Sequence, residues 1–127
     1  MPPYKKSIVV VEDEPDTAEM FAEMMQINGH HVLKSYGGAQ AIYLITREKP
    51  DLVLLDIMMP DLSGLEVLRF MRRDPRLVHI PVVIVSAKSM PDDVQMGLEA
   101  GADLYLTKPV SYYDLNRAVE DATRDVI

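Results

Sequence analysis

Residues 51–64, DLVLLDIMMPDLSG, decide the fold class of this chain of 127 residues. Four apolar residues, Leu52 to Leu55, run directly into Asp56, and the chain then breaks at Pro60 and Gly64. A short apolar run bounded by turn residues is typical of a strand buried inside a sheet. An ionised carboxylate at the tip of such a strand is costly unless a positive group pairs with it. The sequence must therefore supply a partner for Asp56.

Composition predicts a single folded domain over residues 1–127, with a core at about residues 6–125 and a loose tail in the first few residues. Hydrophobic residues make up 48% of the chain, which is enough for one compact core. No internal repeat, low-complexity tract or Gly/Ser linker marks a domain boundary.

Charge and residue usage exclude several classes of function. The formal net charge of −7 argues against direct binding to nucleic acid or to an anionic membrane. The absence of cysteine excludes disulfides, thiolate catalysis and zinc–thiolate sites. No apolar stretch approaches the roughly 20 residues of a membrane span, and acids follow the first apolar run where a secretory signal would have a cleavage site. We therefore expect a cytoplasmic protein.

Apolar, β-branched runs recur along the chain and predict five strands, at Ile8–Val11, Val32–Leu33, Leu52–Leu55, Val82–Val85 and Leu104–Leu106. The intervening segments have helical spacing, as in Ala18, Phe21, Ala22 and Met25. Ser63 with Glu66 and Ser111 with Asp114 are spaced like capping boxes, and Gly29 and Gly101 like helix stops. Strands and helices that alternate in this way predict a (βα)5 doubly wound α/β domain with a parallel sheet.

Charged and polar groups follow four of the five predicted strands. They are Glu12 and Asp13 after the first strand, Asp56 after the third, Ser86 after the fourth, and Lys108 with Pro109 after the fifth. Ligands bind at this carboxyl edge in open α/β sheets. Three carboxylates brought together repel one another unless a divalent cation compensates them. Mg²⁺ fits best because it prefers oxygen ligands, and Mn²⁺ shares that preference.

This arrangement suits phosphoryl transfer to a carboxylate. Asp56 could attack a phosphorus atom and form an acyl phosphate. The metal and Lys108 would then supply positive charge to the phosphoryl oxygens, and the Ser86 hydroxyl would donate to another of them.

The motifs VVEDEP, LLDIMMPDLSG, VSAK and GADLYLTKP resemble, in order and spacing, those of the response-regulator receiver domains of two-component signalling, the CheY-like family. The resemblance extends roughly from Lys6 to Asp125. It implies a flavodoxin-like five-stranded parallel sheet in the order 2-1-3-4-5. It also implies a signalling switch that catalyses only its own phosphorylation and dephosphorylation, and is otherwise not an enzyme.

The resemblance assigns a role to each motif residue. Asp56 would accept the phosphoryl group and, with Asp13, ligate the metal directly. Glu12 would act through water, and Met58 would lend its backbone carbonyl to the metal. Lys108 would contact the phosphoryl group.

Two further features follow from the resemblance. The Lys108–Pro109 peptide bond would be cis, a geometry that proline alone makes cheap. Ser86 and Tyr105 match the switch pair of the family. Phosphorylation would draw the Ser86 hydroxyl toward the new charge and let Tyr105 turn inward, which changes the surface formed by the fourth helix, fifth strand and fifth helix.

The partners are implied at the level of the family alone. The donor would be a sensor histidine kinase or a histidine phosphotransfer protein, and the target a downstream protein, an attached effector domain or a second copy in a phosphorylation-dependent homodimer. The sequence leaves open the cognate kinase, the output pathway, the phosphate lifetime and the choice between a stand-alone regulator and a domain of a longer protein.

Three other functions fit these residues less well. A haloacid-dehalogenase-type phosphohydrolase needs a second acid two residues after its nucleophile, where this chain has Met58, and a cap segment, for which we find no candidate. A flavodoxin-like cofactor binder does not suit the acids of VEDEP, which lie where a flavin phosphate would bind. A scaffold that only keeps the fold would more plausibly have lost Asp56, Asp13 or Lys108.

Each candidate residue also has an ordinary interpretation. Glu12 and Asp13 suit a helix start, Asp56 a turn, Lys108 an exposed surface, Ser86 a local backbone bond and Tyr105 a half-buried strand position. Their coincidence on one edge of the sheet favours the functional interpretation. We interpret His30 and His31 as solvated loop residues, and Arg72 and Arg73 as charges that suit the end of a helix.

Overall fold

The computed structural model of the chain describes residues 5–124. Residues 1–4 and 125–127 lie outside the described residues, and with them most of the expected N-terminal tail and the last residue of the expected core. Within the described range, no helix is long and apolar enough to cross a membrane.

Five strands form one parallel sheet in the described part of the chain. They are β1 (Ser7–Val11), β2 (His31–Ser35), β3 (Leu52–Leu55), β4 (Val82–Ser86) and β5 (Leu104–Thr107). Their order is β2-β1-β3-β4-β5, and every neighbouring pair is parallel. The predicted flavodoxin-like order is confirmed, and the predicted Val32–Leu33 run is the middle of a longer strand.

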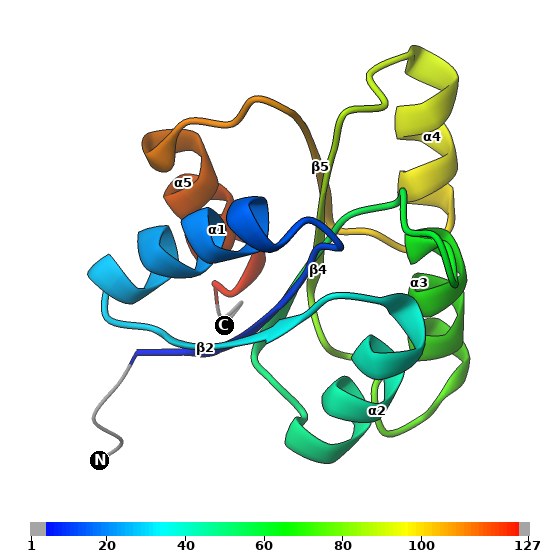
Figure 1. The fold of residues 1–127 in the computed structure, drawn as a ribbon. Helices are drawn as coiled ribbons and strands as arrows, with labels where there is room; N and C mark the ends of the chain where they lie inside the picture. The colour runs from blue at the N-terminus through cyan, green and yellow to red at the C-terminus, as the bar shows by residue number, and fades with distance from the viewer. Residues whose placement is uncertain (1–4, 125–127) are drawn as a thin grey trace.

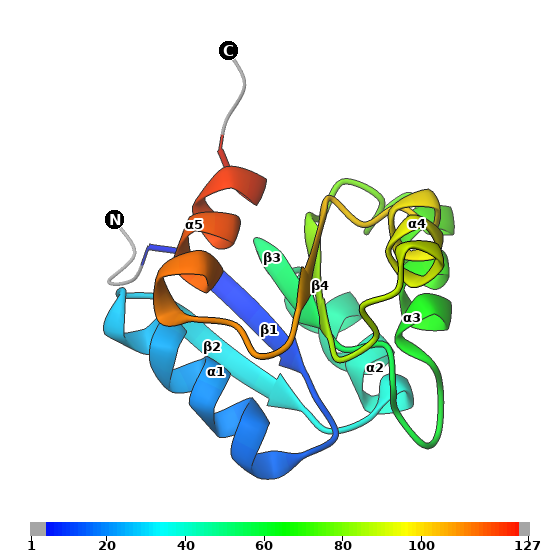
Figure 2. The same cartoon turned by 90° about the horizontal axis from the view of Figure 1, so that it is seen from above.

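A helix follows each strand. The helices are α1 (Pro15–Ile27), α2 (Gly38–Glu48), α3 (Gly64–Arg73), α4 (Pro91–Glu99) and α5 (Tyr112–Ala122). Helices α1 and α5 cover one face of the sheet, and α2, α3 and α4 cover the other (Figure 1 and Figure 2). This three-layer arrangement confirms the doubly wound (βα)5 architecture.

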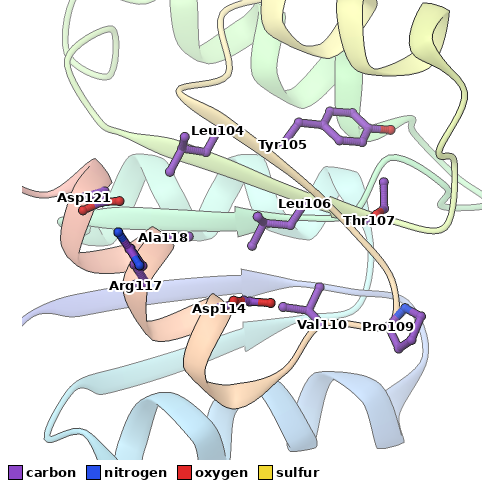
Figure 3. Close-up of a pocket in the computed structure, with 10 residues that line it drawn as sticks. All are labelled: Leu104, Tyr105, Leu106, Thr107, Pro109, Val110, Asp114, Arg117, Ala118 and Asp121. Atoms are coloured by element: carbon purple, nitrogen blue, oxygen red, sulfur yellow. The ribbon is translucent and has the colours of Figure 1, made fainter.

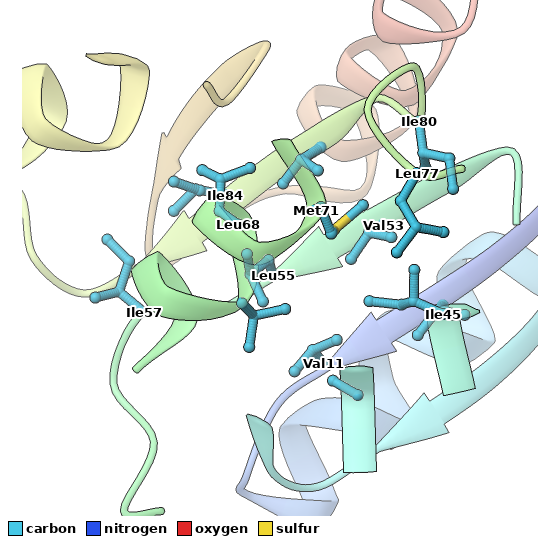
Figure 4. Close-up of a cluster of buried hydrophobic side chains, with 14 residues drawn as sticks. Val11, Ile45, Val53, Leu55, Ile57, Leu68, Met71, Leu77, Ile80 and Ile84 are labelled. Atoms are coloured by element: carbon cyan, nitrogen blue, oxygen red, sulfur yellow. The ribbon is translucent and has the colours of Figure 1, made fainter. Parts of the chain in front are cut away.

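Each strand contributes to two cores because successive side chains point to opposite faces of the sheet. Val9 and Val11 of β1 pack in the cluster beneath α2 and α3, together with Leu55 and Ile84 (Figure 4). Ile8 and Val10 pack in the other cluster, with side chains of α1 and α5. Burial on both faces explains why the central strands β1, β3 and β4 contain continuous apolar runs instead of alternating ones.

The helix boundaries follow the predicted signals. The Ser63 hydroxyl caps α3 by accepting from the backbone N–H of Leu65 at 3.2 Å, and not from Glu66. The Ser111 hydroxyl caps α5 by accepting from the N–H of Asp114 at 3.0 Å. Gly29 and Gly101 have φ values of 90° and 115°, the left-handed conformation in which a glycine ends a helix without strain.

His30 is a correction to the sequence interpretation. It lies directly before β2, where its N–H donates to the carbonyl of Met25, and only 8% of the residue is exposed. Neither ring nitrogen has a hydrogen-bond partner among residues 5–124. Burial lowers the pKa of the imidazole, and the positive charges of Lys5 and Lys6 lower it further. His31, in contrast, is exposed at the start of β2.

Candidate functional site

The carboxyl ends of β1 and β3 bring three acids together. The two strands pair so that Val11 lies opposite Leu55, and the N–H of Asp56 donates to the carbonyl of Val11 at 3.0 Å. Carboxylate oxygens of Glu12, Asp13 and Asp56 consequently all lie within 4.8 Å of one another. Glu12 and Asp56 are buried, whereas Asp13 is exposed to solvent.

Gly64 allows helix α3 to begin against the end of β3. A Cβ atom at this position would lie 2.1 Å from the carbonyl oxygen of Asp56, so no other residue fits without a backbone shift. The N–H of Gly64 donates to the carbonyl of Ile57 at 2.9 Å, which closes the loop that follows Asp56. The local sequence therefore fixes the backbone on either side of the candidate nucleophile.

Lys108 pairs with two of the acids. Its Nζ donates to Oδ2 of Asp56 at 2.9 Å and to Oε1 of Glu12 at 2.5 Å. The backbone N–H of Lys108 donates to the carbonyl of Ser86 at 2.9 Å, and the Lys108–Pro109 peptide bond is cis. The loop after β5 thus carries the ammonium group to the ends of β1 and β3, and supplies the partner that Asp56 needed.

The three carboxylates give this cluster a net negative charge even with Lys108 beside it. Burial raises the pKa of Glu12, and its hydrogen bonds with Lys108 and the Glu14 N–H only partly oppose this. Burial alone would lower the pKa of Lys108, but its bonds to Glu12 and Asp56 outweigh that effect and raise it. In the described part of the chain, this group of three carboxylates is paired with one ammonium, so its net negative charge favours a further cation.

The donor atoms fit a hard divalent cation. All three acids offer oxygen, the ligand type of Mg²⁺ and Mn²⁺. The backbone of Met58 lies beside them, because its N–H donates to Oδ1 of Asp56 at 3.2 Å, while the residue is 53% exposed. The predicted metal role of the Met58 carbonyl stays a prediction.

Ser86 and Tyr105 both form hydrogen bonds with the backbone of Lys88. Ser86 is fully buried at the end of β4, and its hydroxyl accepts from the N–H of Lys88 at 3.2 Å. The Tyr105 hydroxyl donates to the carbonyl of Lys88 at 2.7 Å. Burial raises the pKa of the Tyr105 phenol. Sequence reasoning missed Lys88 as the connecting residue because a backbone partner leaves no signal in side-chain identity.

A groove of 490 Å³ runs between β5 and α5. Leu104, Leu106 and Val110 line it together with Arg117 and other residues of α5 (Figure 3). The Tyr105 ring points away from α5 (Figure 3). The outer edge of β5 therefore presents apolar side chains toward α5 and the switch tyrosine toward the other side.

Residues 8–120 match the response regulator receiver domain family, so the chain belongs to this family of two-component signalling proteins. The chain is 42% identical over 110 residues to the phosphate regulon transcriptional regulatory protein PhoB of Pseudomonas aeruginosa, covering 87% of this chain and 48% of that protein. It is 35% identical over 106 residues to the polar-differentiation response regulator DivK of Brucella anthropi, covering 84% of this chain and 86% of that protein. The chain therefore spans about half the length of the first relative and most of the second.

Solved structures agree with this assignment. A putative response regulator from Chloroflexus aurantiacus superimposes with a TM-score of 0.90 at 25% identity, over 96% of this chain and 98% of the other. The BeF3-activated receiver domain of RstA from Klebsiella pneumoniae gives a TM-score of 0.86 at 31% identity, over 94% and 99%. Membership of this family confirms that the chain is a signalling domain, as predicted. Receiver domains generally bind Mg²⁺ in an acidic pocket.

Proposed function

We propose that this receiver domain accepts a phosphoryl group on Asp56 in a Mg²⁺-dependent reaction, from a sensor histidine kinase or a histidine phosphotransfer protein. The observation that carries the proposal is the contact of Lys108 with Asp56 and Glu12 beside Asp13. The contact supports the proposal because a buried carboxylate, an ammonium and two further carboxylates, all with oxygen donors, lie together.

The chemistry is a displacement at phosphorus. A carboxylate oxygen of Asp56 forms a bond to phosphorus while the bond from phosphorus to the donor breaks and the donor leaves with that electron pair. The Lys108 ammonium lies 2.9 Å from Asp56 Oδ2 and turns to the phosphoryl oxygens as negative charge gathers on them. Asp13, Asp56 and the Met58 carbonyl, with Glu12 acting through water, would hold Mg²⁺, and the bound ion would supply further positive charge there. The product is an acyl phosphate, which the domain hydrolyses in a slow reaction of its own.

Phosphorylation then alters one surface. The new phosphoryl oxygens attract the Ser86 hydroxyl, which gives up its bond from the Lys88 N–H. The loop that carries Lys88 moves, and the bond from Tyr105 to the Lys88 carbonyl changes with it. The surface of α4, β5 and α5, including the groove beside Arg117, then controls partner binding or homodimer formation.

The output is a protein contact. The net charge of −7 does not favour direct contact with nucleic acid or with an anionic membrane. The target is a downstream protein or an effector domain on the same chain, and the domain works in the cytoplasm, where its kinase presents phosphohistidine.

Intact-mass spectrometry after incubation with acetyl phosphate and Mg²⁺ tests the proposal. One added phosphoryl group is expected on the wild type, and none on Asp56→Asn or in samples with a chelator. Asp56→Asn is a matched control because the amide keeps the shape and loses the nucleophilic charge. A wild type that stays unmodified and also fails to bind beryllofluoride would leave the scaffold interpretation in its place.

A further inference from the structure

Helix α4 has a glycine at the one position where it is buried against the sheet. Gly97 is the sole buried residue of this helix within the described range. Its φ lies outside the left-handed region, so the backbone itself does not require a glycine here. A glycine inside a helix is less favourable than an alanine because it loses more conformational freedom on folding. The reason for Gly97 must therefore be space.

The ring of Tyr105 occupies that space. A Cβ atom at position 97 would lie 2.8 Å from Cδ2 and 2.9 Å from Cε2 of Tyr105, and 2.9 Å from Cδ1 of Ile84. Carbon atoms that are not bonded stay at about 3.5–4.0 Å at their best separation, so either the ring or the helix would have to move. The tyrosine is the easier group to displace because it lies on the edge strand β5 and is only half-buried.

We infer that Gly97 is a positioning residue for the switch tyrosine. By lacking a side chain, it lets the Tyr105 ring lie against α4, where the hydroxyl reaches the Lys88 carbonyl at 2.7 Å. Lys88 in turn donates its N–H to Ser86. Gly97 therefore maintains the connection from Ser86 through Lys88 to Tyr105, and its role in signalling rests on the proposed phosphorylation of Asp56.

The test follows the position of the ring by fluorine NMR on protein labelled with 3-fluorotyrosine. The Tyr105 resonance is identified by its loss in Tyr105→Phe, and its shift between H2O and D2O reports exposure of the ring. Gly97→Ala is expected to increase this solvent shift. Met96→Ala, an exposed neighbour in α4, is the matched control and should leave it unchanged. An unchanged Tyr105 signal in Gly97→Ala would overturn the inference.

A second variant separates Tyr105 from Ile84. Gly97→Ala combined with Ile84→Val removes the Cδ1 atom that a new Cβ would also approach. The increased solvent shift should persist in this double variant, whereas a return to the wild-type signal would assign the glycine to Ile84 and reject the role for Tyr105. If Gly97→Ala does not fold, the double variant Gly97→Ala with Tyr105→Ala tests the inference instead. Recovery of folding in this double variant would support the role of Tyr105, and continued failure to fold would reject it.

The two proposals fail separately. Phosphorylation by acetyl phosphate is measured by intact mass on the same wild-type sample. If the wild type takes no phosphoryl group, the proposed function fails, while the ring position in Gly97→Ala still decides the positioning role. If the wild type is phosphorylated but the ring signal does not respond to Gly97→Ala, only the positioning role is lost.

Discussion

The carboxyl and amino ends of the sheet use polar side chains differently. At the carboxyl end, Lys108 pairs with Glu12 and Asp56 while Asp13 lies beside them, so among residues 5–124 three carboxylates share one paired ammonium. At the amino end, each of the three guanidinium nitrogens of Arg72 donates to at least one acceptor. The carboxyl end therefore gathers an excess of negative charge, whereas the amino end uses a charged side chain to hold loops together.

The contacts of Arg72 explain how the amino end is fixed. Its Nη1 donates to the carbonyls of Val78 and Ile80, at 3.0 Å and 2.8 Å, and its Nε donates to the carbonyl of Gly101 at 2.9 Å. Its Nη2 lies 3.2 Å from Asp103 Oδ2, which also accepts from the N–H of Val82. One side chain from α3 thus joins the segments that lead into β4 and β5.

The largest expected effect comes from Lys108→Met at the carboxyl end. Loss of the ammonium should slow phosphorylation by acetyl phosphate by about 10²-fold, because a fixed positive group is removed from the developing charge. The same change should tighten Mg²⁺ binding, because Glu12 and Asp56 lose a competing cation. Intact-mass spectrometry over time measures the phosphorylation rate, and calorimetric titration measures the affinity for Mg²⁺. Lys88→Met is the control, and a wild-type rate in Lys108→Met would contradict the role of the ammonium.

Arg72→Met should act on stability and leave phosphorylation unchanged. Three carbonyl groups and Asp103 lose a donor, which should cost about 2–3 kcal/mol of unfolding free energy. Urea denaturation measures this cost. Arg73→Met, an exposed neighbour, should change stability by less than about 0.5 kcal/mol. Equal stability of the two variants would show that the contacts of Arg72 do not hold the amino end.

Ser111→Ala is a smaller change, placed near the carboxyl end but away from its chemistry. The hydroxyl caps α5 through the N–H of Asp114, and its loss should cost about 1 kcal/mol. Thermal and urea unfolding should both record the change, and Ser89→Ala, on an exposed loop residue, provides the comparison. Slower phosphorylation of Ser111→Ala would contradict this separation, because it would show that the helix cap also affects the reactive site.

The smallest expected effect is a pH dependence at the amino end. The pKa of His30 is lowered from 6.5 by burial, so the folded state favours the neutral ring. The stability that the neutral His30 ring contributes is fully present above pH 6.5. It is lost as the pH falls from 6.5 through the lower pKa of His30 in the folded state. Lys5 and Lys6 strengthen the shift, and Glu120 and Asp51 oppose it.

His30→Phe should remove this pH dependence. Urea midpoints for the wild type and the variant should be similar at pH 8 and should separate at pH 5, with the variant more stable. His79→Gln, an exposed loop histidine, is the control and should follow the wild type. If the urea midpoints of wild type and His30→Phe changed in parallel with pH, protonation of the His30 ring would not destabilise the folded state.

Most of the fold was predictable from the sequence because its three central strands are buried on both faces. The continuous apolar runs at Leu52–Leu55 and Val82–Val85 match β3 and the first four residues of β4. The parallel register then brings the residues after each strand to one edge, which is why the sequence alone groups Glu12, Asp13, Asp56 and Lys108.

Features that depend on the backbone of distant segments were not predictable. The Tyr105 hydroxyl bonds to a carbonyl, which every residue has, and Gly97 is explained only by the ring that lies on it. The dipole interpretation of Arg72 was incomplete because its acceptors are backbone carbonyls of other loops. His30 was predicted to be solvated, since polarity and a preceding glycine give no sign of burial.

The most direct test of the central claim is to locate the phosphoryl group. After treatment with acetyl phosphate and Mg²⁺, borohydride reduces an acyl phosphate on an aspartate to homoserine, which peptide mass spectrometry places in the sequence. We predict homoserine at position 56 alone, and none when Mg²⁺ is chelated. Homoserine at Asp13 or at Asp51, or none at all on a protein whose mass shows phosphorylation, would contradict the assignment of Asp56.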